Sequence, residues 1–329
     1  MLNWRNLLLL LVAGSLFGLV GCGEKKVKEK EAIATEVHEK KGEQPKEVDK
    51  KIEKPVIVNI IDPTTKDVVK SFTPKDYGYG KDNNQYKAEL RKWAKELARG
   101  TKETPGYDKR MILDRIDANG QVIKGTPQTI LDEDELTERV IQASAKGGDV
   151  EIPLYTTASG YKMEDVPSLN EVVVASYTTR FNGNVAGRSK NIQLSAAAIN
   201  NVILGVGDSF SFNTTVGPRT EETGYQPAPE IINGELVDGI GGGICQTSST
   251  LFNAIDQLPV SYIERHNHSL DVGYVPIGRD ATVSYGGLDF RLKNTTGVPL
   301  LLKAIYKKGS LTIEVRTSKM YKSMMKKPV

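Results

Sequence analysis

Apolar residues at strand-like and helix-like spacing begin at Pro55. The segments PVIVNII and KDVVKSF predict strands. The segment NNQYKAELRKWAKELARG predicts a helix, because Tyr86, Leu90, Trp93 and Leu97 fall at helical spacing. This spacing indicates a stripe that faces a core.

The next segments predict a hairpin, a second helix and a further strand. MILDRIDANGQVIKG reads as a hairpin that turns at Asn119-Gly120, a dipeptide that tolerates positive φ angles. ILDEDELTERVIQASAKGG reads as an acid-capped helix closed by Gly147-Gly148, and DVEIPLYTT as a strand. The order of these elements predicts a small α+β domain over residues 55–165.

A second region of mixed pattern follows the hinge-like segment VPSLNE. VVVASYTTRF reads as a strand, and NIQLSAAAINNVILG as a helix with Ile192, Ala196, Ile199 and Ile203 on one face. A glycine- and polar-rich stretch then leads into the helix pattern TSSTLFNAIDQL, and the remaining segments are strand-rich. We expect an α+β, strand-rich domain over residues 168–317 and a frayed basic tail over 318–329.

The first 54 residues differ from both regions. A positive start at Arg5 and an apolar run from Leu7 to Val20 lead into Leu19-Val20-Gly21-Cys22, which is the pattern of a lipoprotein signal peptide over residues 1–22. The alternative is one transmembrane anchor, but the run is short for a bilayer span. Lipidation of Cys22 would anchor the chain on the outer face of the cytoplasmic membrane, facing the cell wall.

The composition of residues 23–54 predicts a disordered tether. The overall charge bears on nucleic-acid binding, and the cysteine content bears on disulfides. The segment holds ten Lys, nine acidic residues and no aromatic residue. A formal net charge of +3 gives no argument for nucleic acid. The chain has two cysteines, and if Cys22 carries lipid, Cys245 has no disulfide partner within the chain.

Cys245 lies in GIGGGICQTSST, where a glycine-rich loop meets the start of a helix. Backbone N–H groups and the helix dipole lower a thiol pKa there, and glycines let N–H groups approach a substrate as an oxyanion hole. Besides His38 in the tether, the histidines are His266 and His268 in ERHNHS. If that segment is a strand, both point to one face and either is a candidate base.

Three other interpretations of this cysteine are an inert buried thiol, a metal site and a phosphate-binding loop. An inert buried thiol stays open. A metal site made of Cys245, His266 and His268 is disfavoured, since no second cysteine or recognisable ligand spacing is present. A phosphate-binding loop is excluded, because the stretch lacks the required lysine. We therefore predict no metal and no cofactor.

Several blocks of the second region resemble the VanW-domain family. They are, in order, YTTRF, NIQLSAAAIN, GDSFSFNTTVGPRTEETGY, GGGICQTSSTLFNA and ERHNHSLDVGYVPIGRDATV. The part of the first region from the hairpin to EIPLYTT resembles domains regarded as peptidoglycan-binding, which precede cross-linking domains in exported bacterial proteins. A plain spacer domain is the alternative for residues 55–165.

The VanW resemblance implies an L,D-transpeptidase that forms 3-3 cross-links between peptidoglycan stem peptides. It implies Cys245 as nucleophile, His268 as general base and Asp280 as a group that orients His268 or holds structure, while His266 falls at a variable position. Further residues are candidates for the oxyanion hole or for substrate binding: Gly242, Gly243, Gln246, Ser249, Arg219 and Arg265. Of these, Ser249, Arg219 and Arg265 bind a substrate carboxylate or support the site. The alternatives are a non-catalytic wall-binding or scaffolding lipoprotein, and a cysteine carboxypeptidase or endopeptidase of the wall.

Overall fold

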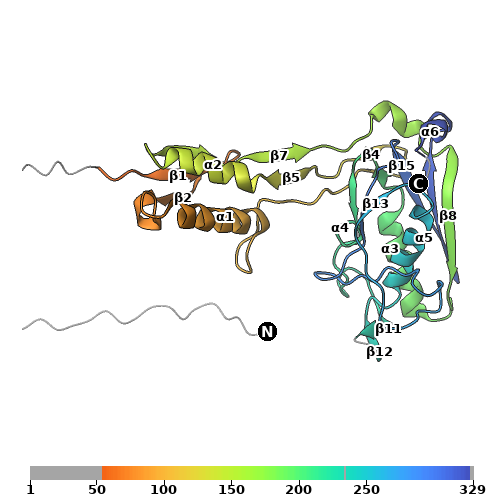
Figure 1. Cartoon of the computed structure of the whole chain (residues 1–329). Coiled ribbons are helices and arrows are strands. Elements are labelled where there is room, and N and C mark those ends of the chain that lie inside the picture. Colours follow the sequence, from red (N-terminus) through yellow and green to blue (C-terminus); the bar gives the residue numbers. More distant parts are fainter. Residues whose placement is uncertain (1–53, 233–234, 327–329) are drawn as a thin grey trace, which may run out of the picture. The chain divides into compact units, whose positions relative to one another are not determined.

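The computed structural model describes residues 54–232 and 235–326 (Figure 1). The predicted signal peptide, the lipidation site Cys22 and residues 23–53 of the tether lie outside the described residues. In the described ranges, no helix combines the length and the apolar character that a membrane span requires.

The first region combines a three-stranded sheet with two helices. β1 (Val58–Ile61) pairs antiparallel with β2 (Val68–Phe72) and parallel with β6 (Gly148–Glu151). α1 (Asn83–Arg99) packs against α2 (Glu133–Ala143), and both contribute to one hydrophobic cluster with the sheet. The predicted helix over α1 and the strands over β1 and β2 are confirmed.

The buried stripe of α1 differs in part from the predicted one. Tyr86 and Leu90 are buried as expected, but Trp93 is only partly buried, whereas Ala94 and Ala98 are fully buried. The small side chains of Ala94 and Ala98 allow α1 and α2 to pack closely, so the buried face of α1 includes these two alanines instead of Trp93.

The predicted single strand DVEIPLYTT is wrong, because Pro153 divides it. β6 ends at Glu151, and β7 (Leu154–Thr157) pairs with β5 (Gln128–Leu131) in a separate two-stranded ribbon. Proline has no N–H to continue a ladder. β5 also occupies residues that we expected to begin the second helix, which instead begins after its cap residue Asp132.

The predicted hairpin is present and packs with the second region of the chain. β3 (Arg115–Ile116) pairs with β4 (Val122–Ile123), and Gly120 has φ 82° in the turn. Met111 and Leu113, which precede it, belong to the hydrophobic cluster of the later helices. Short 3₁₀ turns at η1 (Pro74–Tyr77) and η2 (Met163–Ser168) complete this part.

The second region is built on a four-stranded antiparallel sheet with two helices packed against it (Figure 1). α3 (Ala186–Ile199) and α5 (Ile244–Ile255) contact each other and the sheet, and they enclose the main hydrophobic cluster. The strands of the sheet, in spatial order, are β8 (Val172–Arg180), β16 (Ser310–Thr317), β15 (Leu300–Lys307) and β9 (Ile203–Leu204). The predicted mixed α+β class is confirmed.

Two predictions about this region are wrong in detail. α3 ends at Ile199 because Asn200 is extended and Asn201 has φ 63°, so Ile203 joins β9 instead of the helix face. The basic tail is not frayed over α6 (Lys319–Met324), where the Ser318 side chain caps the helix.

Smaller elements surround the helix α5. β10 (Ser209–Ser211) and β13 (Ser261–Glu264) pair with β14 (Arg291–Lys293). α4 (Phe212–Val216) follows β10, and two further strands form a hairpin immediately before the glycine-rich turn. They are β11 (Pro227–Ile232) and β12 (Glu235–Ile240).

Candidate active site

The turn GIGGGICQ requires glycine for conformation and for space. Gly241 and Gly243 have φ 105° and 108°, values that residues with a side chain rarely adopt. A Cβ atom at Gly242 would lie 2.3 Å from the Ala228 carbonyl oxygen. Gly243 is the N-cap residue of α5, and Cys245 is the second residue of that helix, which confirms its expected position.

Buried polar side chains of α3 fasten this turn. The Asn191 amide nitrogen donates to the Gln226 and Gly242 carbonyl oxygens at 2.8 and 3.0 Å, and its oxygen accepts from the Gln226 N–H at 2.8 Å. Ser195 Oγ lies 2.7 Å from Thr247 Oγ1 on α5. The turn is therefore tied to both helices.

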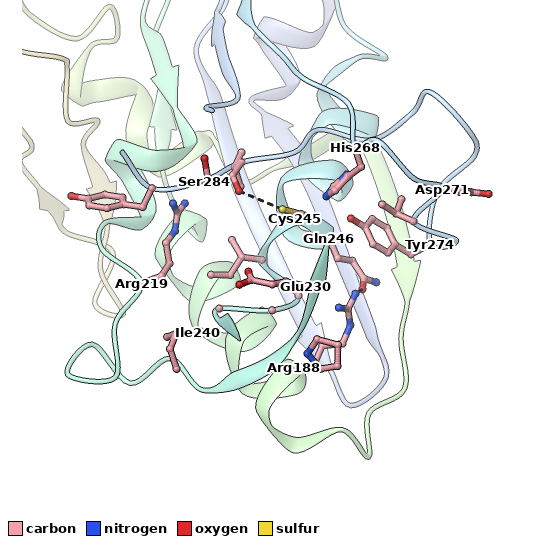
Figure 2. A pocket seen from close by; sticks show the side chains of 18 residues that line it. Arg188, Arg219, Glu230, Ile240, Cys245, Gln246, His268, Asp271, Tyr274 and Ser284 are labelled. Atoms are coloured by element: carbon pink, nitrogen blue, oxygen red, sulfur yellow. Dashed lines mark hydrogen bonds between the residues drawn. The ribbon is translucent and has the colours of Figure 1, made fainter. Parts of the chain in front are cut away.

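Cys245, His268 and Asp280 form one connected arrangement. The His268 ring points toward Cys245 (Figure 2). Its Nδ1 lies 2.7 Å from Asp280 Oδ2, and its backbone N–H donates to the same oxygen at 2.6 Å. Asp280 Oδ1 accepts from the Asn267 amide at 2.6 Å. An Nδ1–H donated to the carboxylate leaves Nε2 for the thiol.

The pKa shifts of the three groups agree with this arrangement. Burial raises the pKa of the Cys245 thiol, but hydrogen bonds with His268, Val283 and Thr282 and the charge of His268 together lower it more, and the net pKa is below its usual value. Burial lowers the pKa of His268, but Cys245 and Asp280 raise it above its usual value. Hydrogen bonds from His268 and Asn267 keep the pKa of Asp280 low despite its burial. Both shifts act toward the thiolate form of Cys245 and the imidazolium form of His268.

The thiol lines a cavity of about 540 Å³. Its sulfur lies 3.5 Å from the Val283 carbonyl oxygen and 3.8 Å from Thr282 Oγ1. The walls come from α3, the segment after α4, the β11–β12 hairpin, the glycine turn and residues 268–285. Within the described ranges, no group of three or more His, Cys, Asp and Glu residues is arranged to hold a metal ion.

Two residues of the turn that line the cavity, Gly243 and Cys245, have backbone N–H groups without a hydrogen-bond partner among the described residues. The Ile244 N–H donates to the Gly241 carbonyl and the Gln246 N–H to the Gly243 carbonyl, at 3.1 and 3.0 Å. The N–H groups of Gly243 and Cys245 make no hydrogen bond to the described residues. Of the predicted oxyanion donors, Gln246 therefore has its N–H engaged, whereas Gly243 and Cys245 have theirs available.

The Gln246 side chain is fully buried and connects three elements. Its amide nitrogen donates to Thr179 Oγ1 and to the Arg180 carbonyl, both at 3.0 Å, and its oxygen accepts from Arg188 Nη2 at 2.7 Å. These contacts give Gln246 a positioning role. Arg188 itself was missed in the sequence, because it lies in the polar stretch GNVAGRSK, which carries no mark of burial.

Arg219 lines the cavity from the segment after α4 (Figure 2). Its Nε and Nη2 are buried and have no hydrogen-bond partner among the described residues. Its guanidinium carbon lies 5.5 Å from the Tyr285 ring centre and 5.8 Å from that of Phe212. Burial lowers its pKa below the usual arginine value, which signals an incompletely solvated charge.

Ser249 and Arg265 do not line the cavity; they support the segment that carries Asp280. Ser249 is fully buried, and its Oγ accepts from the Ala281 N–H at 2.9 Å. Arg265 Nη1 donates to the Asp280 carbonyl at 2.8 Å, and its guanidinium lies 4.5 Å from the Phe252 ring centre. Both residues therefore fix the backbone of the segment at Asp280 and Ala281 and do not contact the cavity directly.

The histidine segment is not the strand that we expected, since β13 ends at Glu264. His266 Nε2 lies 3.1 Å from Glu264 Oε1, and His266 does not line the cavity. His268 alone of the two faces Cys245.

Comparison with known proteins finds a family match over the part of the chain that contains the cavity residues. Residues 187–316 match the family described as VanW like protein, and the resemblance to that family is confirmed over this range. The second region is therefore similar to VanW-like proteins over these residues. Cys245, His268, Asp280, Arg188 and Arg219 all lie inside the matched residues.

Two curated relatives match parts of the chain. An uncharacterized protein, YoaR, of Bacillus subtilis (strain 168) is 43% identical over 178 residues, which are 54% of this chain and 59% of that protein. The vancomycin B-type resistance protein VanW of Enterococcus faecalis (strain ATCC 700802 / V583) is 32% identical over 111 residues, 32% of this chain and 40% of that protein. The chain thus spans about half the length of these relatives. No solved structure matches.

Proposed function

We propose that this protein cross-links peptidoglycan by cysteine-dependent acyl transfer, as an L,D-transpeptidase that makes 3-3 cross-links. The observation that carries the proposal is the Cys245–His268–Asp280 arrangement on a 540 Å³ cavity. The similarity to a vancomycin resistance protein supports a role at the cell wall.

The first half of the reaction forms a thioester. The Cys245 thiolate attacks the carbonyl of the L-centre of the third residue in a donor tetrapeptide, and a carbon–sulfur bond forms. We assign the oxyanion to the N–H groups of Cys245 and Gly243, which make no hydrogen bond to the described residues. The carbon–nitrogen bond to the terminal D-alanine breaks, and the proton of the His268 imidazolium passes to the leaving amine.

The second half transfers the acyl group to an amine. The neutral side-chain amine of an acceptor stem attacks the thioester, and His268 takes its proton. The new carbon–nitrogen bond forms, the carbon–sulfur bond breaks, and the thiolate–imidazolium pair returns. Asp280 holds the ring in the tautomer that both steps need.

The proposal extends to the ends of the chain. We place the protein on the outer face of the cytoplasmic membrane, held by a lipid on Cys22, with residues 23–54 as the tether. Residues 55–165 are proposed to bind peptidoglycan near the reacting stems. Addition of labelled lipid precursors to producing cells tests the anchor, since Cys22→Ser should abolish the label.

The direct test uses purified residues 54–329, which form one compact unit. The protein is incubated with disaccharide-tetrapeptides, and products are identified by mass spectrometry. Wild type should give dimers and a transient adduct on Cys245, while Cys245→Ala should give neither. His268→Gln should lose activity and His266→Gln should keep it, because only His268 lines the cavity. A wild-type protein that yields no dimer, no tripeptide and no adduct would refute an enzymatic role.

The same experiment separates the alternatives. Tripeptides without dimers would make the protein a carboxypeptidase, in which water receives the acyl group. A scaffolding lipoprotein would show no chemistry, and Cys245→Ala cells would grow and cross-link their walls like wild type.

A further inference from the structure

The cavity beside Cys245 holds two arginines that lack a carboxylate partner. No ion pair is formed by Arg188 or Arg219 in the described part of the chain. Two nitrogens of Arg219 are buried without a hydrogen-bond partner, which costs about 1–3 kcal/mol for each such group. The cost is removed if a ligand supplies the missing acceptors.

The two guanidinium groups lie to different sides of Cys245 (Figure 2). Arg219 stands against the Tyr285 ring, whereas Arg188 is held by Gln246 and lies 5.9 Å from the Tyr274 ring centre. Both interact electrostatically with Cys245. A peptide bound in this cavity with its carbonyl on the thiol would have one arginine on each side.

The acidic groups of the cavity wall do not neutralise these arginines. Asp271 points away from the cavity in Figure 2, and its Oδ1 accepts from the Gly273 N–H. Glu230 lines the wall, and burial raises its pKa without any compensating cation. Neither carboxylate of the cavity wall forms an ion pair with Arg188 or Arg219 in the described part of the chain.

We propose that Arg188 and Arg219 form two separate carboxylate subsites, one on each side of the nucleophile. The donor is then a peptide with a free carboxylate on the leaving side of the scissile carbonyl and a second carboxylate on the acyl side. Planar guanidinium groups bind carboxylates through paired N–H donors, which fixes direction as well as charge. This proposal rests on acyl transfer at Cys245 and adds the charge pattern of the donor.

A first experiment tests the subsites without any transpeptidase activity. Cys245 of the full chain is alkylated with iodoacetate, an anion, and with iodoacetamide, its neutral counterpart, and the two rate constants are divided. Arg219→Gln and Arg188→Gln should each lower this ratio by about fivefold to tenfold, because a nearby cation no longer attracts the anion. Arg91→Gln, on the exposed surface of α1, is the matched control and should leave the ratio unchanged.

The division by the iodoacetamide rate separates charge recognition from folding. A variant that merely unfolds would alkylate at the rate of a free cysteine with both reagents. Arg219→Lys keeps the charge and should keep most of the anion preference. A ratio in both glutamine variants equal to that of wild type would overturn the proposal.

A second experiment assigns each arginine to one carboxylate. Donor tetrapeptides are prepared with the terminal carboxylate amidated, or with the acyl-side carboxylates amidated, and initial rates are measured for wild type and both glutamine variants. Each amidation should slow wild type by tenfold or more, and should cancel the effect of replacing the arginine that binds that carboxylate.

The two experiments keep the two claims apart. A lowered alkylation ratio with no dimer, tripeptide or adduct would refute the proposed function and leave the anion subsites standing. Dimers formed equally well from amidated and free donors would refute the subsites and leave the acyl transfer standing.

Discussion

Replacement of Asp280 tests whether its carboxylate holds the catalytic histidine. Asp280 is 6% exposed and accepts three hydrogen bonds, two from His268 and one from Asn267. In Asp280→Ala, the two His268 donors lose their acceptor, and about 1–3 kcal/mol for each gives a loss of roughly 2–6 kcal/mol in the free energy of unfolding. Asn267 is exposed, so water replaces its bond.

Asp280→Asn is the matched comparison, because it keeps the shape and one acceptor oxygen of the side chain but removes its charge and replaces the other oxygen with an NH2 group. We expect roughly half the loss of the alanine variant, measured by urea unfolding, with thermal midpoints lower by about 2–4 °C per kcal/mol. In both variants, alkylation of Cys245 by iodoacetamide at pH 6 should slow, because the imidazolium that stabilises the thiolate loses its counter-charge. A stable Asp280→Ala protein that alkylates as fast as wild type would refute the reasoning.

Three further predictions concern the glycine turn, the cavity wall and pH. Gly242→Ala should cost about 1–3 kcal/mol in urea unfolding, since its Cβ would overlap a backbone oxygen, whereas Gly120→Ala has open space and should cost only about 1 kcal/mol; equal losses would contradict the packing. Glu230→Gln should lower the ratio of dimers to tripeptides several-fold, because the Glu230 carboxylate on the cavity wall attracts the acceptor as an ammonium ion, which gives up its proton before the neutral amine attacks; an unchanged ratio would refute this role of Glu230. The pKa of Asp280 is lowered in the folded state, so its stabilisation is full above about pH 4 and fades as pH falls through the lower folded value; the gap in unfolding free energy between wild type and Asp280→Asn should therefore close in acid.

The sequence pattern predicted elements better than it predicted their ends. Apolar spacing located α1 and α3, because burial of one face repeats along each helix, and the Asn119-Gly120 dipeptide located the hairpin β3–β4. The apolar spacing wrongly extended the predicted helix α3 to Ile203, because an isoleucine at helical spacing can also belong to a strand. The turn at Asn201 and the break at Pro153 decide these ends through backbone conformation, which the apolar pattern does not record.

The candidate site was predicted through its chemistry, and missed where tertiary packing decides. Cysteine and histidine are rare in this chain and have specific uses, so the sequence points to Cys245 and to the pair His266 and His268, and the family resemblance favoured His268. Arg188 is one of many polar residues, and only Gln246 and Tyr274, distant in sequence, make it part of the cavity. Gln246 looked like a substrate or oxyanion donor because it adjoins the nucleophile, yet the helix turns its side chain inward.

Asn191 gives the glycine turn a property that its composition would not suggest. Glycines carry the greatest backbone entropy in an unfolded chain, so a run of them is expected to move. The buried Asn191 amide donates hydrogen bonds to the Gln226 and Gly242 carbonyl oxygens and accepts one from the Gln226 N–H. These bonds fix the turn in one conformation, so its backbone entropy is lost when the protein folds. The N–H groups beside Cys245 are thus preorganised before any peptide arrives, and binding does not have to order them.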